Sequence, residues 1–265
     1  MISLKIYFTS IKGRRKSNED RHNIILNLNE DNPNYNPINL FGIYDGHGGT
    51  WVSEYLEKNI PQYYMNTKFR LPFNKEFHTK VFQLIQSELL KKPTGYSNGS
   101  TCLLNLMFKY NGSIYMNVVN LGDSRMCVVD TNGITKSITT DHKPDDPYEK
   151  SRLTKMGGEI YKDSEGVFRI GDLSLSRAFG DGDNAPYISQ KPDVFTIMVT
   201  SQTKYIVMAC DGLWDIIETK NLGKIINNIK KNNPKIDNIS VELANYALKK
   251  GSTDNISVIV IEVVY

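Results

Sequence analysis

Cysteine is scarce in this chain of 265 residues, and no pattern gives it a structural role. The three cysteines, Cys102, Cys127 and Cys210, stand inside apolar strand patterns without any CxxC spacing. This excludes a disulfide framework and a zinc site built on thiolates. We expect free, buried and reduced thiols in an intracellular, cytoplasmic protein, with the nucleus as an alternative location.

Long apolar runs and a strong excess of charge are also absent. No stretch approaches the ~20 apolar residues that a membrane span requires. Residues 1–16 place basic residues after a strand pattern, which is the wrong order for a secretory signal. The formal net charge of +3 is too small to indicate a nucleic-acid partner. We therefore predict no membrane and no nucleic-acid binding, and we expect a monomer.

Strand and helix patterns do not alternate along the chain as they do in βαβ units. Asn-Gly pairs at 111–112 and 132–133 join consecutive strand patterns and are typical of antiparallel hairpins. The runs 101–109 and 113–121 are apolar on both faces, which indicates a sheet covered on each side. The prediction is an α+β fold with helices layered on antiparallel sheets, in a single domain over residues 1–265. The predicted strands are 4–10, 24–28, 40–44, 101–109, 113–121, 125–130, 134–139, 195–199, 205–210 and 256–264, and the predicted helices are 50–65, 74–91, 146–156, 219–231 and 239–249.

Two segments lack regular periodicity. Residues 29–39 are rich in Asn and Pro and are expected to form a surface loop. Residues 162–188 predict a long, partly mobile loop, and loops of that length are usually functional.

Three carboxylates stand beside apolar runs. Asp45 and Asp211 each follow a strand pattern and precede a glycine that lets the backbone approach closely, and Asp254 comes just before the run 256–264. Acidic groups gathered at the edges of core strands repel one another, which raises their pKa values or unfolds the site unless a cation is present. The pattern therefore predicts a metal enzyme.

The flanking residues separate these positions from ordinary Asp-Gly turns. Residues 44–49 (YDGHGG) surround a carboxylate and a histidine with glycines, which frees backbone groups to face a ligand. Residues 210–215 (CDGLWD) place a second carboxylate one helical turn after the first. Residues 14–20 (RRKSNED) are either a solvated charged turn or a cation for an anionic substrate beside acids for a metal.

All candidate metal ligands are oxygen donors, and no Cys/His cluster accompanies them. Hard oxygen ligands select Mg²⁺ or Mn²⁺ over zinc or copper. The carboxylates exceed what one such ion needs, so a site with two ions is the economical hypothesis. Two ions ~3.5–4 Å apart can bridge a hydroxide and stabilise an in-line displacement at phosphorus. The candidates are Glu19, Asp45, Asp141, Asp211, Asp254 and the Gly46 carbonyl.

Taken in order, these motifs resemble the metal-dependent protein phosphatases, also called the type 2C family. The resemblance implies a four-layer α/β/β/α sandwich, two central antiparallel sheets flanked by helices, with the metals at one end. It covers essentially the whole chain. The matching segments are 15–20 (RKSNED), 44–49 (YDGHGG), 99–101 (GST), 122–125 (GDSR), 141–144 (DHKP), 173–181 (LSLSRAFGD), 209–215 (ACDGLWD) and 254–257 (DNIS).

The resemblance also implies a metal role for each matching acid. Asp45 resembles the carboxylate that bridges two ions. Asp211 and Asp254 would complete the shell of one ion. Glu19, through water, and the Gly46 carbonyl would serve the other.

Three further roles follow from the same resemblance. Asp141 resembles the ligand of a weaker third metal, shared with Asp211. Arg15 is expected to hold the substrate phosphate through its fork of donors. His47 is similar to the proposed general acid that protonates the leaving Ser or Thr oxygen.

Other polar residues are interpreted structurally. We expect His142 to be a hydrogen-bonding residue of the scaffold, and Asp123 and Arg125 to form an internal ion pair. The loop around residues 171–181 resembles the family's flap, which borders the substrate cleft, and it departs from common members of the family. Gly171-Asp172 stands where Asn-Gly is frequent and Ser174 where Ala is, which bears on substrate preference.

The leading hypothesis is a signalling enzyme, a serine/threonine protein phosphatase that hydrolyses phosphoprotein monoesters by direct attack of a hydroxide bridging two Mg/Mn ions. One alternative is a catalytically silent binding module of the same fold, although such a module is expected to have lost a ligand. Another is a metal-dependent nuclease or phosphodiesterase, which requires a basic groove with stacking aromatics.

Overall fold

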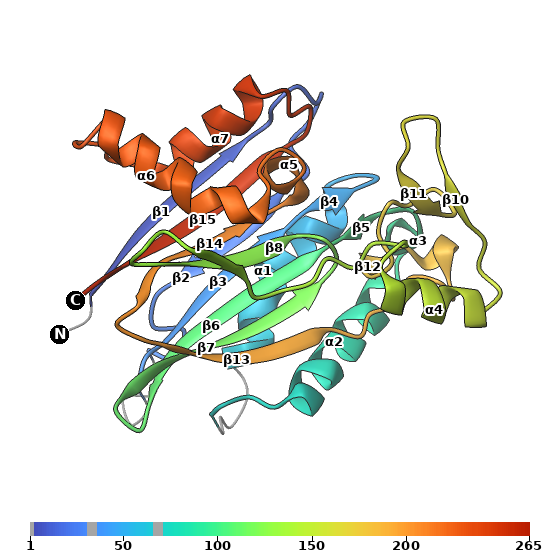
Figure 1. Ribbon diagram of the computed structural model, residues 1–265. Helices are drawn as coiled ribbons and strands as arrows, with labels where there is room; N and C mark the ends of the chain where they lie inside the picture. The colour runs from blue at the N-terminus through green and yellow to red at the C-terminus, as the bar shows by residue number, and fades with distance from the viewer. Residues whose placement is uncertain (1–2, 31–35, 66–70) are drawn as a thin grey trace.

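Two five-stranded antiparallel sheets lie face to face at the centre of the protein (Figure 1). The computed structural model describes residues 3–30, 36–65 and 71–265. The first sheet has the strand order β1-β15-β14-β8-β9 and the second β13-β7-β6-β3-β2. Their strands are β1 (Ser3–Ile11), β2 (Arg21–Ile25), β3 (Ile38–Tyr44), β6 (Cys102–Tyr110), β7 (Ser113–Leu121), β8 (Arg125–Asp130), β9 (Thr135–Ser137), β13 (Asp193–Val199), β14 (Thr203–Ala209) and β15 (Ile256–Val264).

Helices cover the outer face of each sheet (Figure 1). Helices α1 (Trp51–Met65) and α2 (Lys75–Leu89) share a core with the second sheet, and α6 (Leu222–Asn232) and α7 (Ile239–Lys249) share one with the first. The layers therefore run α/β/β/α, and the predicted fold is confirmed. Within the described ranges, no helix is both long and apolar enough to cross a membrane.

Strand β6 shows why the central strands are apolar on both faces. Leu104 and Leu106 join the core beneath α1 and α2, whereas Leu103 and Met107 join the core between the two sheets. Because successive side chains of a strand point to opposite faces, a strand buried on both sides reads as a continuous apolar run.

The loop predicted at 162–188 is partly wrong. The hairpin of β10 (Ile160–Lys162) and β11 (Phe168–Ile170) overlaps its start, and the strand β12 (Phe179–Gly180) lies within it. The Asp163 carboxylate closes the hairpin turn by accepting hydrogen bonds from the backbone N–H groups of Glu165 and Val167. Strands this short carry no periodic signal, which is why the sequence pattern missed them.

Several element boundaries also differ from the predictions. Strand β2 begins at Arg21 and ends at Ile25, earlier than the pattern indicated, and residues 38–39 of the predicted loop belong to β3. The middle of that loop, residues 31–35, lies outside the described residues. Helix α4 (Pro147–Lys155) begins as predicted, because Asp146 caps it through the backbone N–H groups of its first turn.

A third, small sheet was not predicted from the sequence. Its order is β12-β5-β4, with β4 (Gly46–His47) and β5 (Gly99–Ser100). The short helical segments α3 (Thr94–Ser97) and η1 (Gly182–Asn184) lie beside it, whereas α5 (Asp211–Trp214) and η2 (Thr219–Asn221) lie against the first five-stranded sheet and its helices. The small sheet joins segments that are far apart in the sequence at one end of the sandwich. The single-domain division over residues 1–265 stays a prediction.

Candidate functional site

Two of the site's carboxylates lie at the ends of strands of the two central sheets. Asp45 follows β3 directly, and Asp211 begins α5 just after β14. A Cβ added at Gly46 would overlap the main chain of Glu19, and one at Gly212 would overlap the main chain that precedes β15. Each glycine is therefore required by close backbone packing beside its carboxylate.

The acidic side chains form two overlapping groups. Asp45, Asp123 and Asp211 offer oxygen atoms within 4.8 Å of one another, and Asp45 forms a second such group with Asp20 and Cys210. Burial, reinforced by the neighbouring carboxylates, raises the pKa values of Asp45 and Asp211 well above their ordinary range. A cation would remove this repulsion, and closely spaced carboxylate oxygens suit a hard divalent ion. The residues present therefore fit a divalent metal.

Asp20 provides independent evidence for a metal ion at this site. One of its carboxylate oxygens accepts a hydrogen bond from Ser257 Oγ at 2.6 Å, and the other has no partner among the described residues. Burial raises the pKa of Asp20 to about 6. The Cys210 thiol is bonded within the protein, since its sulfur accepts from the Ser257 N–H and burial raises its pKa well above the usual value. The unpartnered Asp20 oxygen, and not the thiol, is thus suited to a metal or its hydration water.

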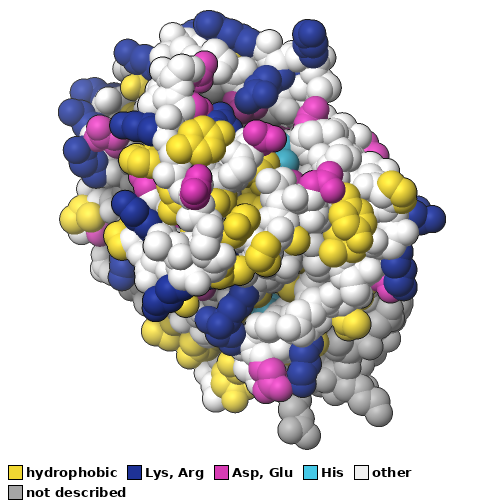
Figure 2. Space-filling model, turned by 90° about the vertical axis from the view of Figure 1, so that its right-hand side faces the viewer, with side chains coloured by type: hydrophobic (Ala, Val, Ile, Leu, Met, Phe, Trp, Pro, Cys, Tyr) yellow, Lys and Arg dark blue, Asp and Glu magenta, His cyan; other side chains and the backbone are white. Residues whose placement is uncertain are grey.

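One cleft of about 660 Å³ is lined by Asp45, Asp123 and Asp211 together with the predicted Arg15, Glu19, Gly46, His47 and Asp254. The predicted Asp141 is not among the residues that line it. Arg15 donates from Nη2 to Asp254 Oδ2 at 2.6 Å, and its side chain is 58% exposed. Glu19 accepts from the Gly49 N–H at 3.1 Å through Oε2. The cleft therefore has acids at its floor and cations at its mouth, which Arg14 and Lys16 extend. Figure 2 views the end of the molecule that carries the β10–β11 hairpin, where acidic side chains border a partly covered histidine.

His47 enters the same cleft from β4. Its Nε2 lies 2.9 and 2.8 Å from the two carboxylate oxygens of Asp181, which follows β12. Burial on its own lowers the pKa of His47, but the hydrogen bond and the charge of Asp181 outweigh it, so the pKa is raised. The ring is thus held beside a group that favours its protonated form.

Comparison with known proteins decides the family. A family model described as Protein phosphatase 2C matches residues 4–256. The chain belongs to the protein phosphatase 2C family. Enzymes of this family are metal-dependent serine/threonine protein phosphatases, and this phosphatase, like them, acts on phosphorylated proteins.

Curated relatives agree with this assignment. A "PP2C-like domain-containing protein" of Acanthamoeba polyphaga mimivirus is 40% identical over 166 residues, which cover 54% of this chain and 92% of the viral protein. "Probable protein phosphatase 2C member 13, mitochondrial" of Oryza sativa subsp. japonica is 30% identical over 267 residues, which cover 98% of this chain and 68% of the rice protein. The "Probable protein phosphatase 2C 7" of the same species is 29% identical, and the chain spans 64% of its length.

Solved structures show the same fold. A phosphatase from Toxoplasma gondii superimposes with a TM-score of 0.83 at 21% identity, covering 98% of this chain and 94% of that one. A Caenorhabditis elegans sex-determining protein superimposes with a TM-score of 0.86 at 24% identity, covering 98% of this chain and 64% of that one.

In this phosphatase, Asp123 and Arg125 each have a partner other than the predicted one. The expected pair of Asp123 with Arg125 is wrong: Arg125 binds both oxygens of Asp141, at 2.9 and 2.6 Å, and Lys143 binds Asp123. Asp141 is therefore held by a guanidinium and lies outside both acidic groups found among the described residues, whereas Asp123 belongs to one. The physical reason is that the pairing of β8 with β9 brings Asp141, which follows β9, within reach of the guanidinium fork of Arg125 at the start of β8.

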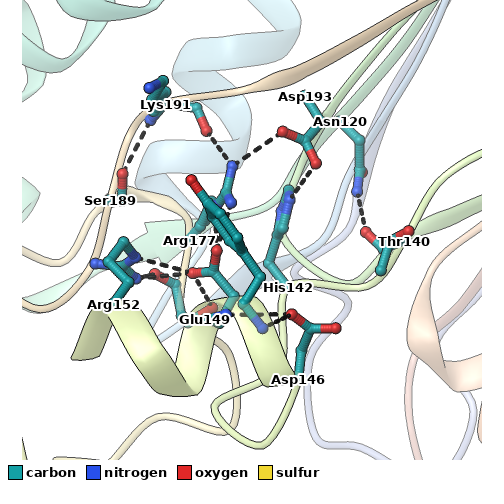
Figure 3. A network of polar contacts seen from close by, with 12 residues as sticks. Asn120, Thr140, His142, Asp146, Glu149, Arg152, Arg177, Ser189, Lys191 and Asp193 are labelled. Atoms are coloured by element: carbon teal, nitrogen blue, oxygen red, sulfur yellow. Dashed lines mark hydrogen bonds and ion pairs between the residues drawn. The ribbon is translucent and has the colours of Figure 1, made fainter. Parts of the chain in front are cut away.

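A buried polar network supports the flap that borders the cleft (Figure 3). Glu149 is fully buried on α4 and accepts hydrogen bonds from Arg177, from Arg152 at 2.8 Å and from Ser176 Oγ at 2.8 Å. Burial by itself raises the pKa of Glu149, but the bonds and charge of Arg177 dominate and lower it. The carboxylate is thus anionic and ties α4 to residues 176–177 of the flap.

His142 links this network to the acidic groups. Its Nδ1 accepts from the Gly122 N–H at 3.0 Å, so its Nε2 carries the hydrogen and donates to Asp193 at 3.3 Å (Figure 3). Gly122 precedes Asp123, one of the clustered acids. His142 therefore makes the structural hydrogen bonds that the sequence interpretation gave it.

Sequence reasoning missed three acids of the site. Asp20 stands beside Glu19 in a motif that was noted, and Asp123 stands in the segment 122–125, where its proximity to Arg125 suggested an ion pair instead. Asp181 ends the segment 173–181 and received no role. Each lay in a motif that could have identified it, but its partner could not be read from the local sequence.

Proposed function

We propose that this phosphatase hydrolyses phosphoserine and phosphothreonine monoesters of proteins by direct attack of water, with two Mg²⁺ or Mn²⁺ ions bound and no covalent phosphoenzyme. The observation that carries the proposal is the close group of the buried Asp123 and the half-buried Asp45 and Asp211, in a cleft whose mouth is cationic. When bound, the ions lower the pKa of water and neutralise charge that develops on the phosphoryl oxygens.

The two overlapping acidic groups support the assignment of ligands. Asp45 belongs to both groups, which suits a carboxylate that holds both ions. Asp211 and Asp254 would serve one ion, and Glu19 and the Gly46 carbonyl the other. All of these residues line the same cleft.

A weaker third ion is better assigned to a different acid. Asp123 lies within 4.8 Å of Asp211, and Lys143 binds only one of its two carboxylate oxygens. Asp141 lies outside both acidic groups of the described residues, and Arg125 binds both of its oxygens. We therefore place the third ion, if one binds, at Asp123 and Asp211 in preference to Asp141.

Arg15 and His47 act on the substrate itself. The Arg15 guanidinium lies at the cleft mouth, where its parallel N–H donors can bind two phosphate oxygens. His47 donates a proton to the Ser or Thr oxygen as the P–O bond breaks and its electron pair moves to that oxygen. The ring then returns to its neutral form.

A metal-dependence assay on a phosphoserine peptide tests the proposal. Activity should vanish after chelation and return with Mn²⁺ or Mg²⁺, and Asp211→Asn and Asp254→Ala should each lower kcat at least about 100-fold. Asp237→Asn is the matched control, because this exposed aspartate lies outside the cleft.

Three results would contradict the proposal. Activity that survives chelation would exclude the metal mechanism. Mn²⁺ binding by calorimetry without turnover of any phosphoester would favour the silent binding module. Faster hydrolysis of a phosphodiester than of the monoester would favour the nuclease alternative.

A further inference from the structure

The small sheet β12-β5-β4 brings His47 next to a single acidic side chain. His47 lies opposite Gly99 in the pairing of β4 with β5, and Gly99 lies opposite Gly180 in the pairing of β5 with β12. Asp181 follows Gly180 directly. Three segments that are far apart in the chain thus form one row, His47–Gly99–Gly180, and Asp181 comes directly after the last residue of that row.

The contact between the two side chains occupies one specific nitrogen of the ring. Both oxygens of Asp181 lie within 2.9 Å of His47 Nε2. The Asp181 side chain is 3% exposed and that of His47 is 27% exposed. Nε2 is therefore committed to the carboxylate, and Nδ1 is the ring nitrogen left to act in the cleft.

Glycine at position 99 leaves the space in which this contact forms. A Cβ on Gly99 would overlap both His47 Nε2 and the Asp181 carboxylate. No residue with a side chain fits between the two strands without displacing the pair. The backbone of β5 is thus shaped around the His47–Asp181 contact.

Independent hydrogen bonds hold Asp181 in place. Its backbone N–H donates to the Asn98 carbonyl at 3.0 Å, and it adopts a left-handed conformation with φ +53°. Gln86 of α2 binds both backbone groups of Gly180, donating to its carbonyl at 2.8 Å and accepting from its N–H at 2.9 Å. Aspartate tolerates this left-handed conformation better than most non-glycine residues, and the hydrogen bonds on both sides fix it here.

We propose that Asp181 is a positioning residue of the phosphatase reaction, which orients His47 through Nε2 so that Nδ1 delivers the proton to the leaving Ser or Thr oxygen. The inference rests on the proposed function and adds to it a specific partner and a specific ring nitrogen. As the P–O bond breaks, its electron pair goes to the ester oxygen and the Nδ1 proton follows it. The neutral ring keeps its Nε2–H on Asp181, in the way a buried aspartate orients the histidine of a serine protease.

This role can be tested with two substrates, one whose leaving group must be protonated and one whose leaving group need not be. Alkoxide from phosphoserine needs a proton to leave, whereas nitrophenolate from p-nitrophenyl phosphate does not. Asp181→Asn should lower kcat on a phosphoserine peptide about 10–100-fold, with a much smaller loss on p-nitrophenyl phosphate. His47→Asn should show the same selectivity, and the double variant should lose no more than His47→Asn alone.

The matched control is Asp183→Asn, an exposed aspartate two residues away that lies outside the cleft. It should leave both activities unchanged, and thermal unfolding should confirm that all variants are folded. Equal losses on both substrates, or additive losses in the double variant, would overturn the role of Asp181. If the wild-type protein with Mn²⁺ hydrolyses neither substrate, the proposed function itself fails, which is a separate outcome.

A measurement on the wild-type protein does not depend on the variants folding. In ¹H–¹⁵N spectra of histidine-labelled protein, the neutral His47 ring should carry its hydrogen on Nε2. The resonance is assigned by its loss in His47→Asn. A ring that carries its hydrogen on Nδ1 alone would overturn the inference.

Discussion

Asn105 offers a sharp test of how the core between the two sheets is built. It lies on β6, opposite Phe41 of β3 and Val118 of β7, and both of these residues belong to the core between the sheets. Asn105 is fully buried, and neither its amide oxygen nor its amide nitrogen has a hydrogen-bond partner among the described residues. A buried amide in this state destabilises the fold.

Replacement by leucine should therefore stabilise the phosphatase. Leucine has a similar branched shape, adds apolar contact with the surrounding side chains and removes both unpartnered groups. Mutational data place the cost of a buried unpartnered polar group at about 1–3 kcal/mol, so Asn105→Leu should raise the free energy of unfolding by about 2 kcal/mol. For a chain of this length this corresponds to a Tm increase of about 4 °C.

Asn117 on the neighbouring strand β7 is the matched control. It is also fully buried, but its Oδ1 accepts from His78 Nε2 at 2.8 Å and its Nδ2 donates to Thr196 Oγ1 at 3.2 Å. Asn117→Leu leaves those partners unsatisfied and should destabilise by about 1–3 kcal/mol. Urea denaturation and thermal unfolding of both variants measure the two effects.

The opposite result for Asn105 would refute the reasoning. If Asn105→Leu lowers the free energy of unfolding by 1 kcal/mol or more, the amide is bound within the core, for example by an internal water molecule. Equal destabilisation in both variants would show that the difference in hydrogen bonding between Asn105 and Asn117 has no effect on stability.

Three further predictions concern the network, the pH dependence and the metal. Glu149→Gln should destabilise by about 2 kcal/mol or more in urea denaturation, because it removes the fully buried carboxylate bound to Arg177 and leaves the partly exposed Asp193, at 3.3 Å, as the remaining counter-charge among the described residues; a loss under 1 kcal/mol would contradict this. Burial lowers the pKa of His78 to about 4 from an ordinary 6.5, so the unfolded chain takes up a proton first as the pH falls. Stability should therefore drop by about 2 kcal/mol between pH 7.5 and pH 5 through this group, and a His78→Gln variant whose stability falls as steeply would refute the assignment. Mn²⁺ should raise the Tm of the wild-type protein, because it relieves the repulsion between Asp45 and Asp211, and the increase should be lost in Asp45→Asn when both are measured by thermal unfolding.

The local sequence carried most of the information about layers and ligand chemistry. A run such as 101–109, apolar on both faces, predicts a strand covered on each side, because side-chain alternation along a strand is a local property. Asp45 and Asp211 could be singled out for a similar reason: an apolar run that ends in Asp-Gly places a carboxylate at a strand tip with room for close packing. The restriction to oxygen donors predicted a hard cation before any geometry was known.

The choice of partners was decided only by the tertiary structure. Arg125 binds Asp141 and not Asp123, which is only two residues away in the sequence. Strand pairing and side-chain reach determine which carboxylate contacts the guanidinium. His47 contacts Asp181, which is 134 residues away in the sequence. The small sheet that brings them together has strands too short to produce a periodic pattern in the sequence. Local patterns report what a residue can do, whereas contacts between distant segments depend on how every intervening element packs, and no single stretch of sequence contains that information.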